Sequence, residues 1–286
     1  MEPTQKTTGQ PGLAECKTIH CLERMAVVYP SGNTTAIIFD QLPDYDPKIL
    51  NNQVMQAWKS RYPDQPEIEQ CCIVTTPQDP CALARVTMLG GEFCGNATRS
   101  ALWLLAAGKQ RTGLIEVSGT NRPLIFRVRG EEVMLEMPTP REGKLVRQVK
   151  EGWLVQLDGI AQLVTTKGTE QTLRKLLQNL LSNNAYGLIN QPAVGVSSYD
   201  QTTKRAAFCV WVKAVATIFD ETACGSGTCA IGIATAWKSG RSSVLRVIQP
   251  SGEVIRTETA YAPGAVTISF IAGSVKVLYD GKFKLA

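Results

Sequence analysis

Two cysteines of this 286-residue chain, Cys94 and Cys224, stand directly before glycine at the start of apolar segments with helical spacing. The segments are FCGNATRSALWLLAAG, from Phe93, and ACGSGTCAIGIATAWKSG, from Ala223. Free backbone N–H groups and the positive end of the helix dipole lower the pKa of a thiol at such a place from about 8.5 toward neutrality. We therefore expect each cysteine to supply an accessible thiolate.

The small residues after each cysteine are suited to holding an anion, because their N–H groups are free and a ligand can approach the backbone. These residues are Gly95 and Asn96 in one segment, and Gly225 and Ser226 in the other. If both starts face one cleft, a carboxylate is held between two dipoles with a sulfur on each side of its α-carbon. One thiolate then removes the α-proton, and the opposite thiol returns a proton to the other face.

The surroundings of the two cysteines repeat along the chain. An isolated Cys-Gly pair is usually a small buried hydrophobe beside a packing glycine. Here Ile115 lies 21 residues after Cys94 (115 − 94), and Leu245 lies 21 residues after Cys224 (245 − 224), each in an expected strand. Further strands match, ARVTML with AFCVWV before the cysteines, and RPLIFRVR/EVMLEM with EVIRTET/AVTISF after them. This duplication favours function over packing, and it indicates two similar α/β halves that meet near residues 137–140.

Composition restricts the class of protein. With 44% hydrophobic and 19% charged residues, the chain can bury a sizeable core. It shows no apolar stretch near the ~18 residues of a membrane span and no signal segment, so we expect a cytoplasmic location. The nine cysteines are then expected to be mostly reduced thiols. The net charge of +5 is scattered without a basic run, which argues against a nucleic-acid partner.

Other catalytic and metal sites fit the sequence poorly. Cys16, His20 and Cys21 form a C-x3-H-C cluster without a second ligand pair at zinc-like spacing, so we expect no metal site. A hydrolase would have to use His20, the sole histidine, and no G-x-S-x-G turn is present. The run CGSGT lacks the Gly-Lys-Ser/Thr end of a phosphate-binding loop.

Three segments, SGNTTAIIFD, EFCGNATRS and ETACGSGTCA, resemble the signatures of the diaminopimelate epimerase family over residues 17–286. Members of that family racemise or epimerise amino acids without pyridoxal phosphate, so the resemblance implies no cofactor. It also implies an α+β fold of two pseudo-symmetric halves, each with a sheet wrapped round a central helix. The first half would be residues 17–138 plus about 273–286, the second 139–272, and residues 1–16 a flexible tail.

The resemblance also assigns roles to individual residues. Cys94 and Cys224 match the catalytic pair, and Asn33 matches an asparagine that supports the site. The glycines and polar residues after the cysteines match the carboxylate clamp. Glu221 and Thr222 match the Glu-Thr pair before the second cysteine.

Departures from the diaminopimelate enzymes bear on the substrate. TMLGGEF lacks a Phe-Asn-x-Asp-Gly-Ser segment and WVKAVATIFDETAC lacks Glu-Arg-Gly, the groups that would hold a distal carboxylate. The phrases PSGNTT, IEQCC, GGEFCGNATRS, CGSGT and IQPSG instead resemble the histidine racemase branch, associated with opine-type metallophore synthesis. In that branch Glu69 and Gln70 would face the substrate side chain, which makes Glu69 a candidate partner of an imidazole. A solvated surface charge is the alternative for Glu69.

Several alternatives stay open at this point. Diaminopimelate or another amino acid could replace histidine as the substrate of an epimerase or racemase. A non-catalytic protein that binds an amino acid in the same cleft is the alternative from another class. The expected partner is a small amino-acid substrate, with no membrane partner and with a homodimer as one option for assembly.

Overall fold

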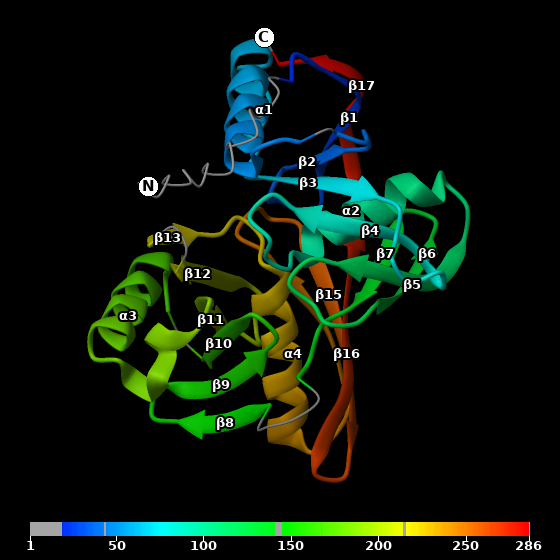
Figure 1. The fold of residues 1–286 in the computed structure, drawn as a ribbon. Coiled ribbons are helices and arrows are strands. Elements are labelled where there is room, and N and C mark those ends of the chain that lie inside the picture. Colours follow the sequence, from blue (N-terminus) through cyan, green and yellow to red (C-terminus); the bar gives the residue numbers. More distant parts are fainter. Residues whose placement is uncertain (1–18, 43, 141–144, 167, 214–215, 286) are drawn as a thin grey trace, which may run out of the picture.

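The computed structural model describes residues 19–42, 44–140, 145–166, 168–213 and 216–285 (Figure 1). The expected tail over residues 1–16 lies outside this range. The described residues form four α-helices, one 3-10 helix and seventeen strands in two sheets. This confirms the mixed α+β class.

The elements alternate along the chain as follows. The helices are α1 (Pro47–Arg61), α2 (Gly95–Ala106), α3 (Glu170–Ser182), η1 (Ala185–Asn190) and α4 (Gly225–Ser239). The strands are β1 (Cys21–Tyr29), β2 (Thr35–Ile38), β3 (Gln70–Thr75), β4 (Ala82–Met88), β5 (Arg111–Val117), β6 (Leu124–Arg129), β7 (Glu132–Glu136), β8 (Val146–Val149), β9 (Gly152–Leu157), β10 (Ile160–Thr165), β11 (Ala193–Tyr199), β12 (Ala206–Val212), β13 (Thr217–Asp220), β14 (Ser243–Ile248), β15 (Val254–Ala262), β16 (Ala265–Ser274) and β17 (Lys276–Lys284). The strands expected around the two cysteine segments are all present.

The larger sheet has eleven strands in the order β14-β15-β16-β7-β6-β5-β4-β3-β2-β1-β17. Its last strand, β17, lies antiparallel to β1, so the end of the chain pairs with its first strand. Strand β16 of the expected second half pairs with β7 of the expected first half. The larger sheet therefore contains strands from both sides of the boundary expected near residues 137–140. The smaller sheet has six strands in the order β13-β12-β11-β10-β9-β8.

Helix α4 lies between the two sheets (Figure 1). It packs against β14 to β16 on one side and against β8 to β11 on the other. Burial on both sides explains why the helix is apolar around most of its circumference. Gly232 permits the close approach of β15, because a methyl group there would lie 2.6 Å from Thr257 Oγ1. Helix α2 packs against β2, β3, β6 and β7 and also contacts α4.

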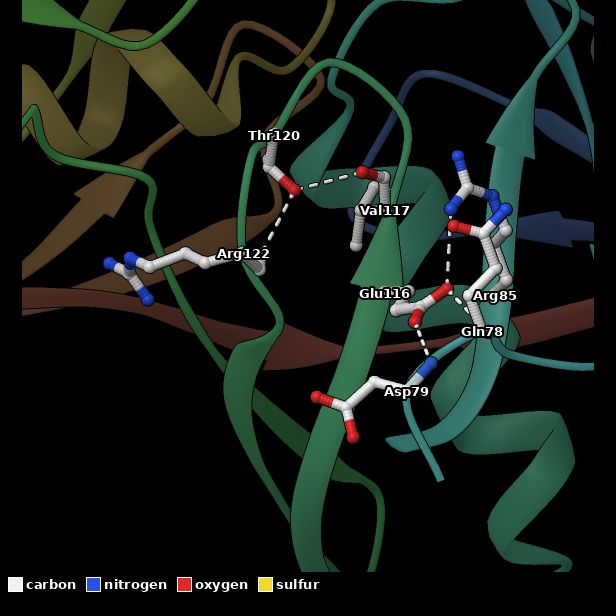
Figure 2. Close-up of polar contacts among 7 residues, drawn as sticks. All are labelled: Gln78, Asp79, Arg85, Glu116, Val117, Thr120 and Arg122. Atoms are coloured by element: carbon white, nitrogen blue, oxygen red, sulfur yellow. Dashed lines mark hydrogen bonds and ion pairs between the residues drawn. The ribbon is translucent and has the colours of Figure 1, made fainter. Parts of the chain in front are cut away.

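Glu116 of β5 fixes the loop between β3 and β4 (Figure 2). Its carboxylate accepts hydrogen bonds from the backbone N–H groups of Gln78, at 3.0 Å, and Asp79, at 2.5 Å. Arg85 Nη1 pairs with the same carboxylate at 3.2 Å. Three donors therefore satisfy a carboxylate that is 8% exposed, which stabilises this edge of the sheet.

The eight cysteines within the described ranges are all free thiols. Across the same ranges, no helix is both long enough and apolar enough to cross a membrane. Grouped His, Cys, Asp or Glu side chains that could hold a metal ion are also absent from these ranges. Cys16, the first member of the C-x3-H-C cluster, lies outside them.

Candidate active site

Cys94 and Cys224 occupy equivalent positions as the residues that cap α2 and α4. Their φ/ψ values are −131°/112° and −127°/109°. The Cys94 sulfur accepts from the N–H of Ala97 at 3.4 Å, and the Cys224 sulfur accepts from the N–H of Gly227 at 3.3 Å. A thiol thus takes the place of the hydroxyl or carboxylate that normally caps a helix, and each sulfur lies at the positive end of its helix.

The two helix starts converge on one place. A methyl group added at Gly95 would lie 2.8 Å from Ile271 Cδ1, and one added at Gly225 would lie 3.0 Å from the same atom. The group at Gly225 would also lie 3.5 Å from Asn96 Oδ1. Asn96 Nδ2 in turn donates to the carbonyl oxygen of Ala223, at 3.4 Å. The structure therefore brings together the residues that the sequence placed in the clamp.

Two buried glutamines support the Cys224 side of this region. Gln162 of β10 is 1% exposed, and its Nε2 donates to Ser226 Oγ at 2.9 Å. Ser226 Oγ lies 3.4 Å from the Cys224 sulfur. Gln249 Oε1 accepts from the backbone N–H of Cys224 at 3.0 Å. These contacts fix the orientation of the helix start.

Sequence reasoning did not single out either glutamine as a site residue. Gln162 interrupts the apolar strand IAQLVT, and Gln249 lies in the IQPSG phrase. An isolated polar residue in a buried strand needs a hydrogen-bond partner. That signal could have marked Gln162, but only the fold shows that its partner is Ser226.

A polar cluster joins the loop after β1 to the start of α4. Asn33 Nδ2 donates to Glu69 Oε2 at 3.1 Å and contacts Glu221 Oε2 at 3.5 Å. Thr222 Oγ1 donates to Glu69 Oε1 at 3.2 Å and accepts from the Asn33 N–H at 3.0 Å. Gln70 Nε2 donates to Asn33 Oδ1. Glu69 is therefore one of two neighbouring carboxylates held by shared donors, and not an isolated surface charge.

The pKa values of both carboxylates are raised. Burial raises the pKa of Glu221 to about 8, and the charge of Glu69 adds to this effect. Burial also raises the pKa of Glu69, although the hydrogen bonds from Thr222 and Asn33 act in the opposite direction. Glu221 therefore keeps its proton over much of the neutral range, and a cation placed beside it would favour loss of that proton.

The expectation that the helix starts bring both thiol pKa values toward neutrality is wrong for this structure. Burial raises the pKa of Cys94 to about 11, and the charges of Glu92 and Glu221 add to the increase. The N–H of Ala97 and the side chain of Gln70 lower it, but by less. Burial likewise raises the pKa of Cys224 to about 12. Desolvation raises the pKa values of the two thiols by more than the helix ends lower them. The size of this desolvation cannot be derived from the sequence alone.

Known proteins with similar sequences identify the family of this chain. A family profile described as the histidine racemase CntK N-terminal domain matches residues 25–283. The chain belongs to this histidine racemase family. A histidine racemase from Fusobacterium nucleatum is 28% identical over 264 residues, which cover 84% of this chain and 92% of the relative. This agrees with the branch whose phrases the sequence resembles.

Solved structures with the same fold include isomerases of other substrates. A hydroxyproline epimerase from Agrobacterium vitis, with bound trans-4-OH-L-proline, aligns with a TM-score of 0.61 at 14% identity, covering 93% of each chain. A phenazine biosynthesis PhzF family protein from Enterococcus faecalis aligns with a TM-score of 0.56 at 14% identity, covering 91% of this chain and 98% of that one. The histidine racemase family member described here therefore shares its fold with PhzF-like and racemase-like proteins.

Proposed function

We propose that the protein is an amino-acid racemase that interconverts L- and D-histidine without a cofactor, using Cys94 and Cys224 as its two acid–base groups. The observation that carries this proposal is the convergence of the two cysteine-capped helix starts on Ile271 Cδ1. Membership of the histidine racemase family supports both the reaction and the substrate.

The proposed reaction is a proton transfer through the α-carbon. One cysteine, as the thiolate, takes the α-proton and becomes a thiol. The electron pair of the broken C–H bond passes to the substrate carboxylate, whose charge is stabilised by the first N–H groups of α2 and α4. The opposite thiol gives its proton to the other face of the carbon and becomes the thiolate. After one turnover the two cysteines have exchanged protonation states, and the stereocentre is inverted.

The clamp in this proposal consists of backbone N–H groups and two short side chains. Gly95 and Asn96 contribute from α2, while Gly225 and Ser226 contribute from α4. Side chains at the two glycines would meet Ile271 within 3.0 Å, so only glycine leaves the backbone free to face a ligand.

The cluster around Asn33 is proposed to recognise the basic end of the substrate. Glu69 and Glu221 place two carboxylates beside the helix starts, and Thr222 and Gln70 orient them and Asn33. A cationic imidazolium or ammonium group would receive charge-assisted hydrogen bonds there. The distal end of diaminopimelate carries a carboxylate beside its ammonium, and that carboxylate would face like charge.

Histidine is therefore expected to be converted faster than LL-diaminopimelate. A site whose buried carboxylates need a cationic partner penalises a substrate that brings an anion, by about 100-fold or more. Chiral chromatography after incubation with a panel of L-amino acids measures this ranking. Faster conversion of LL-diaminopimelate would assign the protein to the alternative epimerase activity. Substrate binding without any chiral conversion, and without loss of the α-proton in D2O, would favour the non-catalytic alternative.

Oxidation is expected to link Cys94 to Cys224 and to inactivate the enzyme reversibly. The two sulfurs stand on either side of one carbon in the proposed mechanism, so a small closure brings them within reach of each other. Because both thiol pKa values are raised, the reaction should be slow near pH 7 and faster near pH 9. Bound histidine should protect the pair.

Peptide mapping of the oxidised protein tests this expectation. A Cys94–Cys224 bridge whose formation tracks the loss of activity, and restoration by a thiol reductant, are the expected results. Loss of activity with both thiols still free, or a bridge between other cysteines such as Cys71 and Cys81, would mean that the two sulfurs do not share a site.

Finer parts of the sequence interpretation remain predictions. We propose the diaminopimelate epimerase-like arrangement of two pseudo-symmetric halves, and the position of α4 between two sheets supports it for the half that carries Cys224. A cytoplasmic location, a homodimer and a part in metallophore synthesis also remain predictions. Light scattering of the purified protein tests the dimer.

A further inference from the structure

Arg99 of α2 is a fully buried arginine, five residues after Cys94. Its Nη2 donates to Asn96 Oδ1 at 2.9 Å and to the carbonyl oxygen of Pro30 at 3.3 Å. Within the described part of the chain, Nε and Nη1 have no hydrogen-bond partner. Both acceptors are neutral, so no hydrogen-bonded carboxylate balances the guanidinium. A buried charge in this condition is strongly unfavourable unless another group compensates it.

The charged groups around Arg99 leave its positive charge largely uncompensated in the resting site. Burial lowers the pKa of Arg99 to about 10, so the guanidinium stays charged at neutral pH. The thiolate of Cys94 and the carboxylate of Glu132 on β7 both favour that charge. Glu132 already pairs with Arg256 of β15, at 2.9 Å from Nη2. The pKa of Cys94 is about 11, so at neutral pH Cys94 is a neutral thiol and leaves the guanidinium without a balancing anion. A thiolate that forms at Cys94 is attracted by this buried positive charge.

The hydrogen bonds of Arg99 connect three segments of the site, two of them directly and the start of α4 through Asn96. By holding Asn96 Oδ1, Arg99 directs Asn96 Nδ2 toward the carbonyl of Ala223, the residue before Cys224. Its bond to Pro30 reaches the loop that ends at Asn33. One side chain therefore links both helix starts and the polar cluster.

We propose that Arg99 is the positioning residue and the permanent counter-charge of the active site. It orients Asn96 for the substrate carboxylate, and it stabilises the negative charge that develops on the Cys94 sulfur and on that carboxylate. The inference rests on the proposed racemase function for the carboxylate, whereas its effect on Cys94 does not require a substrate.

Arg99→Met removes the charge and keeps a long side chain. We expect the rate of Cys94 alkylation by iodoacetamide at pH 8 to fall about tenfold, because less thiolate is present. The rise of kcat/KM with pH should move to higher pH by about one unit, and KM for histidine should increase. Thermal unfolding should change little or shift upward, because replacing a buried charge by an apolar group is often neutral or stabilising.

Arg99→Lys separates the charge from the geometry. It keeps the charge, so the alkylation rate of Cys94 should stay within about threefold of wild type. It lacks the planar fork that holds Asn96 and Pro30 together, so KM should remain raised. If the role of Arg99 were purely structural, both variants would have a lower melting temperature and an unchanged rate of Cys94 alkylation.

The decisive measurement is the alkylation rate of Cys94 in the intact protein, read by mass spectrometry with exposed Cys81 as the internal reference. Arg85→Met, which removes a partly exposed arginine paired with Glu116, is the matched control and should leave the rate unchanged (Figure 2). Equal Cys94 rates in wild type and Arg99→Met would overturn the inference. If Arg99→Met does not fold, Arg99→Gln takes its place, and equal rates for Arg99→Gln and Arg99→Lys would overturn it.

The alkylation assay contains no substrate, so its outcome is distinguishable from that of the proposed function. A wild-type protein that fails to racemise histidine but shows the shift in Cys94 reactivity contradicts the proposed function alone. Racemisation by wild type together with an unchanged Cys94 rate and pH profile in Arg99→Met contradicts the inference alone.

Discussion

Replacing either Cys94 or Cys224 by alanine is expected to lower histidine racemisation by about 100- to 10,000-fold, the usual contribution of a positioned acid or base. Each variant loses one of the two proton carriers, so a proton can be removed or added on only one face of the α-carbon. Histidine should still bind, because the proposed clamp is built mainly from backbone N–H groups of α2 and α4. Chiral chromatography measures the rate, and calorimetry measures binding.

Cys229→Ala is the matched control for this pair. Cys229 is a fully buried thiol of α4 that donates to Ser269 Oγ at 3.3 Å, outside the helix start. Its loss should cost about 1 kcal/mol of stability and leave the rate unchanged. Near-wild-type racemisation by both Cys94→Ala and Cys224→Ala would contradict the two-base assignment.

Glu221→Gln is expected to make the protein more stable near pH 8 and less active. The pKa of Glu221 is raised from 4.5 to about 8 in the folded protein, so the folded state keeps a proton that the unfolded state has lost between these values. Stability from this group is therefore full below about pH 4.5 and declines as the pH rises to about 8. Glutamine does not ionise and avoids the decline, so the free energy of unfolding at pH 8 should be a few kcal/mol higher than in wild type.

The same variant should lose about 10- to 100-fold in kcat/KM for histidine, because a charge-assisted hydrogen bond to the substrate is replaced by a neutral one. Thermal unfolding at about pH 5 and pH 8 and steady-state kinetics provide the two readouts. Glu67→Gln is the control, since Glu67 is 68% exposed and pairs with Lys59 on the surface. Equal stability of Glu221→Gln and wild type at both pH values, or undiminished activity, would contradict the assignment of Glu221 to the substrate site.

The sequence predicted the parts of the fold that repeat. Matching positions of Cys94 and Cys224 before apolar helices, and matching strands 21 residues later, are local patterns that survive in the structure. Apart from the strand AFCVWV, the six-stranded sheet and α3 were not assigned, because nothing in residues 145–205 repeats an element of the first half at a fixed spacing. The buried face of α3, formed by Leu173, Leu177 and Leu180, becomes evident once the sheet that covers it is known.

The chemistry of the site was less accessible from sequence than its location. A helix start predicts a stabilised thiolate, but both thiol pKa values are raised by burial, and the residues beside the helix starts come from distant strands, such as Gln70 on β3 and Ile271 on β16. Glu69 could be read as a surface charge because its neighbour Glu221 lies 152 residues away in the chain (221 − 69). The burial of Arg99 likewise follows from distant segments, Pro30 and Gly273 among them.

Incubation of the wild-type protein with L-histidine in D2O tests the central claim most directly. With two bases, the product receives its proton from the opposite cysteine, which exchanges with solvent. At early times deuterium should therefore appear at the α-carbon of newly formed D-histidine, while the remaining L-histidine keeps its proton. Deuterium in both enantiomers from the start would indicate a single base, and no α-exchange would indicate no racemase; either result would contradict the account.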